Sequence, residues 1–111
     1  MPRRPADTFE SATVELEMSI HQAEFARLLR RLSHVLHAPL TGQHPAAGIS
    51  RHTLRLPAGD VSVHFQPCEP IRLGALRLPR ARISLRMHSL PAPARADFMA
   101  AFRRTFQRGG G

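Results

Sequence analysis

The sequence predicts an α+β fold, a two-layer sandwich with an antiparallel sheet of about four to five strands and two helices on one face. Two observations predict it. Several segments alternate between apolar and polar residues, which is typical of strands with one wet face. Two longer segments repeat apolar residues every three or four positions, as amphipathic helices do. These segments follow one another in the order β-α-β-β-(β)-β-α.

The chain has 111 residues, a length typical of one domain. We expect a flexible N-terminal tail over residues 1–10, a single α+β domain over 11–108 and a flexible glycine tail over 109–111. No apolar run approaches the roughly 20 residues that span a bilayer. The basic start lacks the apolar stretch of a secretory signal. We therefore expect a cytoplasmic protein without a membrane span.

The first strand is predicted from Ala12 to Ile20, where apolar residues occupy alternate positions. Glu15 and Glu17 lie at the intervening positions and face the opposite side. The first helix follows directly, because Ser19 and Gln22 match a capping box. Its apolar positions are Phe25, Leu28, Leu29, Leu32 and Val35 or Leu36.

Proline and glycine mark the segments after this helix. Pro39 and Gly42 end the helix, and the stretch 38–48 has no period, so it is expected to be a loop. Alternating runs over 51–56 and 60–66 predict two strands. The segment 57–60, Pro-Ala-Gly-Asp, is expected to form the hairpin turn between them.

The last third of the chain is expected to hold one more regular strand and the second helix. Residues 71–78 have a poor pattern and are interpreted as a connection that can contain a short edge strand. Residues 80–88 alternate cleanly and predict a strand. Pro91 and Pro93 can open the final helix, in which Phe98, Phe102 and Phe106 recur every four residues.

Positive charge is the dominant feature of the composition. Sixteen basic residues against eight acidic ones give a net charge of +8, and all sixteen are arginine. Such a surface attracts acidic proteins, nucleic acid or anionic lipid. The absence of lysine is equally consistent with a genome rich in G and C. The candidate anion- or partner-binding residues are Arg103, Arg104 and Arg108 on the last helix and Arg55, Arg82 and Arg86 on the sheet.

The outward face of the sheet is a candidate binding platform with one clear alternative. If the first and last strands are neighbours, Glu15 and Glu17 pair with Arg82 and Arg86 and partly neutralise that face. The face also lacks aromatic residues for stacking nucleic-acid bases. On the flank of the last helix the nearby acid is Asp97. The arginines of this helix are therefore better candidates for binding an anionic partner than those of the sheet.

The sequence supports metal binding and catalysis less than it supports binding of an anionic partner. His34 and His37 share a helix face and His44 follows, but a stable zinc or copper site usually needs further ligands in fixed geometry. No metal cofactor is expected. The single cysteine, Cys68, excludes an internal disulfide. The sequence has no GxSxG, Walker or GxGxxG motif, so an enzyme is not favoured.

In element order, the α-β-β-β-α portion resembles a double-stranded-RNA-binding domain. Such domains carry a Lys-rich start to their second helix. Here residues 91–96, Pro-Ala-Pro-Ala-Arg-Ala, have one arginine and no lysine, and the leading strand is additional. The resemblance therefore covers element order alone.

Two function classes remain. The first is a small basic accessory or interaction protein that binds an acidic partner or associates with its own copy. The second is a nucleic-acid-binding module that uses the arginine-rich surface.

Overall fold

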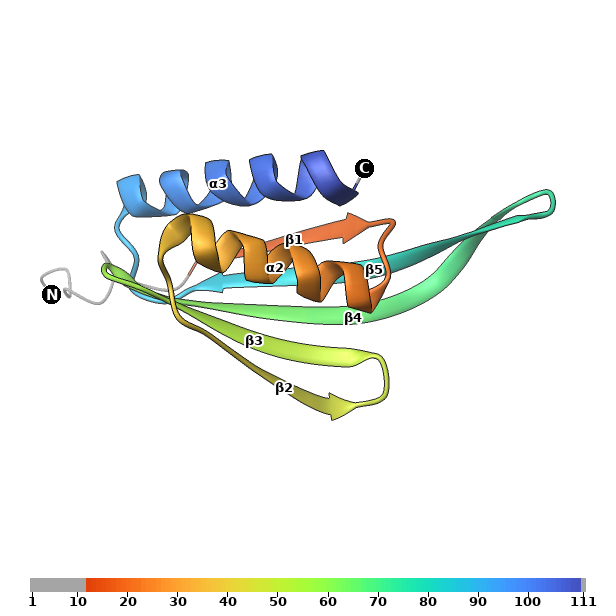
Figure 1. Ribbon diagram of the computed structural model, residues 1–111, viewed down its shortest axis with the longest axis horizontal. Coiled ribbons are helices and arrows are strands. Elements are labelled where there is room, and N and C mark those ends of the chain that lie inside the picture. The colour runs from red at the N-terminus through yellow and green to blue at the C-terminus, as the bar shows by residue number, and fades with distance from the viewer. Residues whose placement is uncertain (1–11, 111) are drawn as a thin grey trace, which may run out of the picture.

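Residues 12–110, which the computed structural model describes, form two helices on one face of a five-stranded antiparallel sheet (Figure 1). This confirms the predicted α+β fold. The elements are β1 (Ala12–Met18), α2 (Gln22–Leu36), β2 (Leu40–Ala46), β3 (Ile49–Leu56), β4 (Gly59–Leu73), β5 (Leu76–Met87) and α3 (Ala92–Gly110). The expected tail over residues 1–10 lies outside the described residues, and α3 continues through two of the glycines expected in a C-terminal tail. None of the described helices is long and apolar enough to cross a membrane.

The sheet has the strand order β1-β5-β4-β3-β2. The first strand thus pairs with the last, and Glu17 lies directly opposite Arg82. The expected turn over residues 57–60 joins β3 to β4. A Cβ at Gly59 would lie 2.6 Å from the backbone oxygen of His88, so this turn needs glycine.

The packing core lies between the sheet and the two helices. Phe25 of α2 contacts Phe65 of β4, with 5.0 Å between ring centroids, and Phe106 of α3, at 5.2 Å. Phe102 stacks on Phe106 at 4.3 Å. All four rings are at most 2% exposed. One aromatic cluster therefore joins both helices to the sheet.

The ends of α2 differ from the sequence prediction. His21, not Ser19, is the N-cap residue, and no side chain caps the helix there, so the predicted capping box is wrong. The helix ends at Leu36 because His37 adopts a left-handed conformation with φ of 52°. Val35 is 58% exposed, so it lies outside the apolar face.

The expected loop over residues 38–48 is wrong, since it contains the edge strand β2. Leu40 is half-buried and lies opposite Leu54, while the rest of β2 is exposed. An edge strand with no buried face has no alternating pattern to detect. Backbone pairing with β3, from Leu40 to Gln43, holds it in the sheet.

The segment 71–78 is not a connection between elements but the end of a long hairpin. β4 and β5 continue past the core, with a bulge between Cys68 and Ile71, and turn at Gly74, where φ is 61°. We call residues 67–79 the arm; every residue in it is exposed or half-buried. The arm extends beyond both helices (Figure 1). It lengthens the molecule to 58 Å and raises the radius of gyration to 15.3 Å, against about 13 Å for a compact domain of this size.

We predict that Phe25→Ala lowers the free energy of unfolding by about 3 to 5 kcal/mol, because it removes the ring at the centre of the aromatic cluster. Val35→Ala on the same helix is the matched control and should cost less than about 0.5 kcal/mol. Urea unfolding followed by circular dichroism measures both. Similar losses in the two variants would contradict this account of the core.

Candidate functional site

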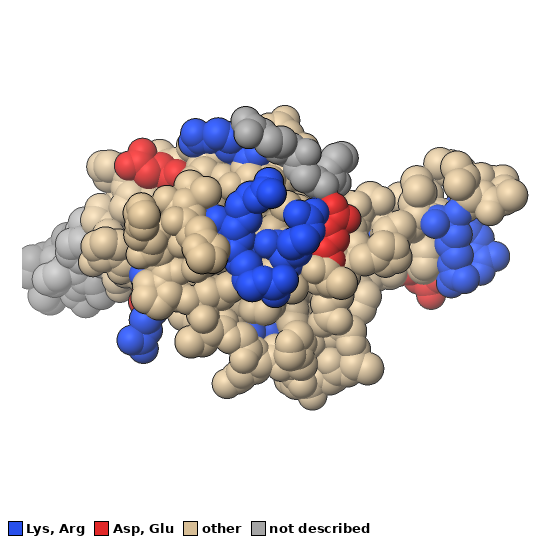
Figure 2. Space-filling view, viewed as in Figure 1, with Lys and Arg blue, Asp and Glu red and all other residues tan. Residues whose placement is uncertain are grey.

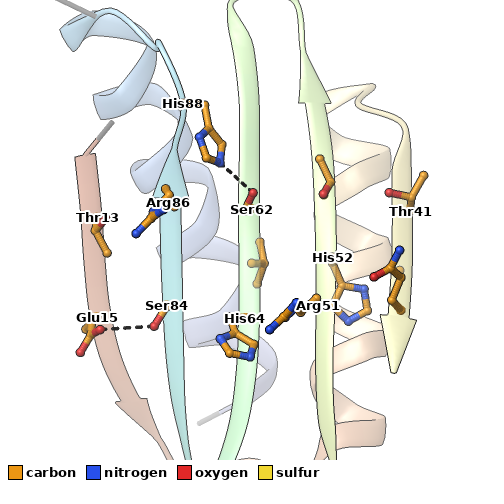
Figure 3. Close-up of a pocket in the computed structure, with 14 residues that line it drawn as sticks. Thr13, Glu15, Thr41, Arg51, His52, Ser62, His64, Ser84, Arg86 and His88 are labelled. Atoms are coloured by element: carbon orange, nitrogen blue, oxygen red, sulfur yellow. Dashed lines mark hydrogen bonds between the residues drawn. The ribbon is translucent and has the colours of Figure 1, made fainter. Parts of the chain in front are cut away.

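The face of the sheet that carries no helix is polar across all five strands. Two rows of directly paired residues cross it. They are Thr13, Arg86, Ser62, Thr53 and Thr41, and Glu15, Ser84, His64, Arg51 and Gln43. We call this surface the open face. Its short hydroxyl side chains lie between longer charged ones, which leaves a hollow of about 580 Å³ (Figure 3).

The open face is partly neutralised, but its contacts differ from the expected pairing of Glu15 and Glu17 with Arg82 and Arg86. Because β1 neighbours β5, Glu17 lies opposite Arg82 and forms an ion pair of 3.8 Å with Arg80. Arg55 lies opposite Asp60 at the far end of the sheet. Ser84 donates a hydrogen bond of 3.4 Å to Glu15 (Figure 3). Exposed pairs of this kind contribute little stability, yet they reduce the field that an anion meets.

Arg51 is a further cation of the open face, beyond the arginines expected from the sequence. It lies between His64 of β4 and Gln43 of β2, at the rim of the hollow. The alternation of the strand indicates this position, because Arg51 and Arg55 are four residues apart and therefore lie on the same face. Its place at the rim depends on its pairing with β2, a segment that was expected to be a loop.

A Ser–His pair lies in the hollow. Ser62 Oγ and His88 Nε2 are 2.8 Å apart (Figure 3), which is the distance expected of a nucleophile and its base. Acyl transfer also requires donors aimed at the developing oxyanion. At mid-sheet the backbone amides of Ser62 and its neighbours lie in the plane of the sheet and bond along it, so they do not point into the hollow. The donors that line the hollow around this pair are therefore side chains, among them Arg51 and Arg86.

A second charged surface covers the helices. Arg27, Arg30 and Arg31 of α2 and Arg103 and Arg104 of α3 are exposed. Figure 2 shows arginine side chains gathered around α2. We call these five residues the helical arginine surface. Of the sequence candidates, Arg103 and Arg104 lie in it, whereas the side chain of Arg108 is outside the described part of the chain.

Helix packing brings the two halves of this surface together. Arg31 and Arg104 line the same small hollow of about 190 Å³ over the seam between α2 and α3. Each helix carries three arginines up to residue 107 and one acid, Glu24 or Asp97. Glu24 forms an exposed ion pair of 3.6 Å with Arg27. The helical side therefore holds a larger excess of positive charge than the open face.

His52 is a buried polar group on the helix side of the sheet. Its ring is 6.4 Å from that of Phe25 and 6.3 Å from that of His44, and its Nε2 is 3.2 Å from Ser50 Oγ. Gly42 makes room for it, since a Cβ there would lie 2.8 Å from His52 Nδ1. Burial, followed by the nearby charge of His44, lowers the pKa of His52 below the ordinary 6.5.

The three histidines considered for metal binding occupy different positions. His34 is exposed on α2, His37 caps the end of that helix, and His44 lies on β2 beside His52. Within residues 12–110, no three or more histidine, cysteine or acidic side chains are grouped so that they could hold a metal ion.

Comparison of the sequence with models of known families and with curated proteins gave no match. The similarity in element order to double-stranded-RNA-binding domains is thus unsupported by sequence.

The lowered pKa of His52 predicts a pH dependence of stability. The unfolded chain takes up the His52 proton near pH 6.5, whereas the folded chain takes it up only at lower pH. As the pH falls below 6.5 the unfolded state binds more protons, and the free energy of unfolding should decrease. Denaturant unfolding at a series of pH values should show a smaller decrease for His52→Gln.

Titration of the ring signals by NMR tests the cause. His44→Gln should raise the pKa of His52 toward 6.5, since it removes a nearby charge. His34→Gln, exposed on α2, serves as the control and should leave the His52 titration unchanged, because His34 is not among the causes of the shift. A His52 ring that titrates at or above 6.5 in the parent protein would contradict this assignment.

Proposed function

We propose that this is a non-enzymatic binding protein that recognises an acidic protein partner through the helical arginine surface. The observation that carries the proposal is that Arg31 and Arg104 line one small hollow over the seam between α2 and α3. Arg27 and Arg30 are exposed on the same helix as Arg31, whereas Arg103 lines a separate hollow on the β1 side of α3, together with Glu17. Exposed like charges gathered on one face oppose folding slightly. An acidic partner relieves that repulsion.

The chemistry of arginine suits this partner. A guanidinium presents a planar fork of donors that matches a carboxylate in two parallel hydrogen bonds. Five such groups on two rigid helices offer an array of carboxylate sites whose spacing is fixed by the helix packing. The open face is the weaker candidate, because Glu15, Glu17 and Asp60 lie among its arginines.

Nucleic acid is the less favoured partner. The five phenylalanines in the described part of the chain are buried, so none can stack on a base. Without stacking, single-stranded nucleic acid would be held by its phosphates alone. Acidic protein therefore remains the proposal, and nucleic acid is one outcome of its test.

We predict that the double variant Arg31→Gln/Arg104→Gln weakens binding of a fluorescent poly-glutamate peptide by about tenfold or more at low salt, because two charge-assisted contacts are lost. Fluorescence anisotropy titration measures the dissociation constant. The matched control is Arg55→Gln/Arg86→Gln on the open face, which changes the net charge equally and should weaken binding by about threefold or less.

Two results would overturn the proposal. Equal losses in the two double variants would show that net charge, not the helical arginine surface, governs binding. Tighter binding of a labelled DNA or RNA duplex than of poly-glutamate at the same salt concentration would assign the surface to nucleic acid.

A further inference from the structure

The distal part of the arm has two chemically different faces. Ile71 lies directly opposite Leu78, and Leu73 opposite Leu76, so four aliphatic side chains share one face. Arg72 lies opposite Arg77 on the other face. This segment is therefore an amphipathic two-stranded hairpin.

The apolar face of the arm is uncovered. Ile71, Leu73 and Leu76 are 38%, 58% and 61% exposed, and with Val35 they are the large hydrophobic residues on the surface of the described chain. A two-stranded hairpin is at best marginally stable unless another layer covers one face. The core ends at Phe65 and Ala81, so neither helix provides that layer. A grouped aliphatic patch of this kind marks a contact surface.

Positive charge accompanies these aliphatic residues. The arm holds Arg72 and Arg77 against a single acid, Glu69, and Arg80 follows at its base. Figure 2 shows arginine side chains gathered at this end of the molecule, separate from those around α2. The arm thus combines apolar side chains with nearby cations.

We propose that the arm binds the surface of an anionic lipid bilayer. Ile71, Leu73, Leu76 and Leu78 enter the boundary between headgroups and acyl chains, while Arg72 and Arg77, on long flexible stems, reach the lipid phosphates. The inference is independent of the helical arginine surface and of its acidic protein partner.

Charge and area favour a bilayer over a second copy of the chain. A second copy has the same net charge of +8, and its arm has the same Arg72 and Arg77. A stable protein interface also buries about 800 Å² on each partner and is usually anchored by aromatic residues. The tip of the arm offers four aliphatic side chains and no ring. A bilayer needs no matching pocket and adds attraction for each arginine near its anionic surface.

The shape of the molecule is compatible with this contact. The arm leaves the domain at the end opposite the β3–β4 hairpin and extends beyond both helices (Figure 1). Its tip can therefore meet a flat surface without interference from the domain. Alternate backbone groups at the tip pair within the hairpin, from Ile71 with Leu78 to Leu73 with Leu76. The groups along its two open edges keep their water when insertion is shallow and stays at the level of the headgroups.

Fluorescence offers a direct test, because the chain contains no tryptophan or tyrosine. The variant Leu73→Trp places one strong fluorophore on the apolar face of the arm. We predict that vesicles of equal parts phosphatidylcholine and phosphatidylglycerol shift its emission to shorter wavelength. The control Ala58→Trp, exposed in the β3–β4 turn, should show no shift. Equal shifts at both positions, or no shift at Leu73→Trp, would overturn the proposal.

Vesicle co-sedimentation provides the second measurement. Leu73→Ser/Leu76→Ser should lower the partition coefficient for these vesicles by about tenfold or more, because two leucine side chains no longer leave water. Arg103→Gln/Arg104→Gln should change it by about threefold or less. The opposite ranking would place membrane contact on the helical arginine surface and refute the role of the arm. Circular dichroism of each variant verifies that the fold is retained.

Light scattering separates bilayer binding from self-association. The parent protein should have the mass of a monomer in the absence of vesicles. A doubled mass that returns to the monomer value in Leu73→Ser/Leu76→Ser would assign the apolar face to a second copy and overturn the proposal.

Discussion

The packing of Phe25 between Phe65 and Phe106 is the interaction on which the rest of the structure depends. This contact holds α2 and α3 against the same face of the sheet. With both helices on one side, the other side faces water, and its strands carry hydroxyl and charged residues instead of apolar ones. The core ends where the helices end. Past Phe65 and Ala81, β4 and β5 continue without a covering layer. The open face and the arm are both consequences of this one-sided packing.

Most of the fold could be predicted because the core residues repeat with a clear period. The even positions of β1 and the Phe98, Phe102 and Phe106 series report directly which faces are buried. Two segments could not be predicted for the same reason. β2 buries little beyond Leu40, so it leaves no alternating pattern. The arm does alternate, but in two runs of only three residues, 71–73 and 76–78, which are too short to define a strand by themselves. Backbone pairing within two hairpins, β2 with β3 and the distal part of β4 with that of β5, defines them.

The candidate sites were only partly predictable. Arg103 and Arg104 could be placed on an exposed flank of α3 by helical spacing, but their approach to Arg31 depends on how the helices pack. From the sequence, Glu17 was expected to face the arginines of the last strand only if the first and last strands were neighbours. The structure makes β1 and β5 neighbours, and their register places Glu17 directly opposite Arg82. The contact of His52 with His44 could not be predicted from the sequence. It depends on the pairing of β2 with β3 and on the space left because Gly42 has no side chain.

The arm is continuous with the second and third strands of the sheet, which has a mechanical consequence. Force applied at Gly74 acts along β4 and β5, parallel to the strands. The backbone hydrogen bonds of β4 to β3 and of β5 to β1 then carry the load in shear, all at once, instead of opening one after another as in peeling. A load along the arm is thereby shared by the β4–β3 and β5–β1 pairings, which would have to slide together before the sheet opens.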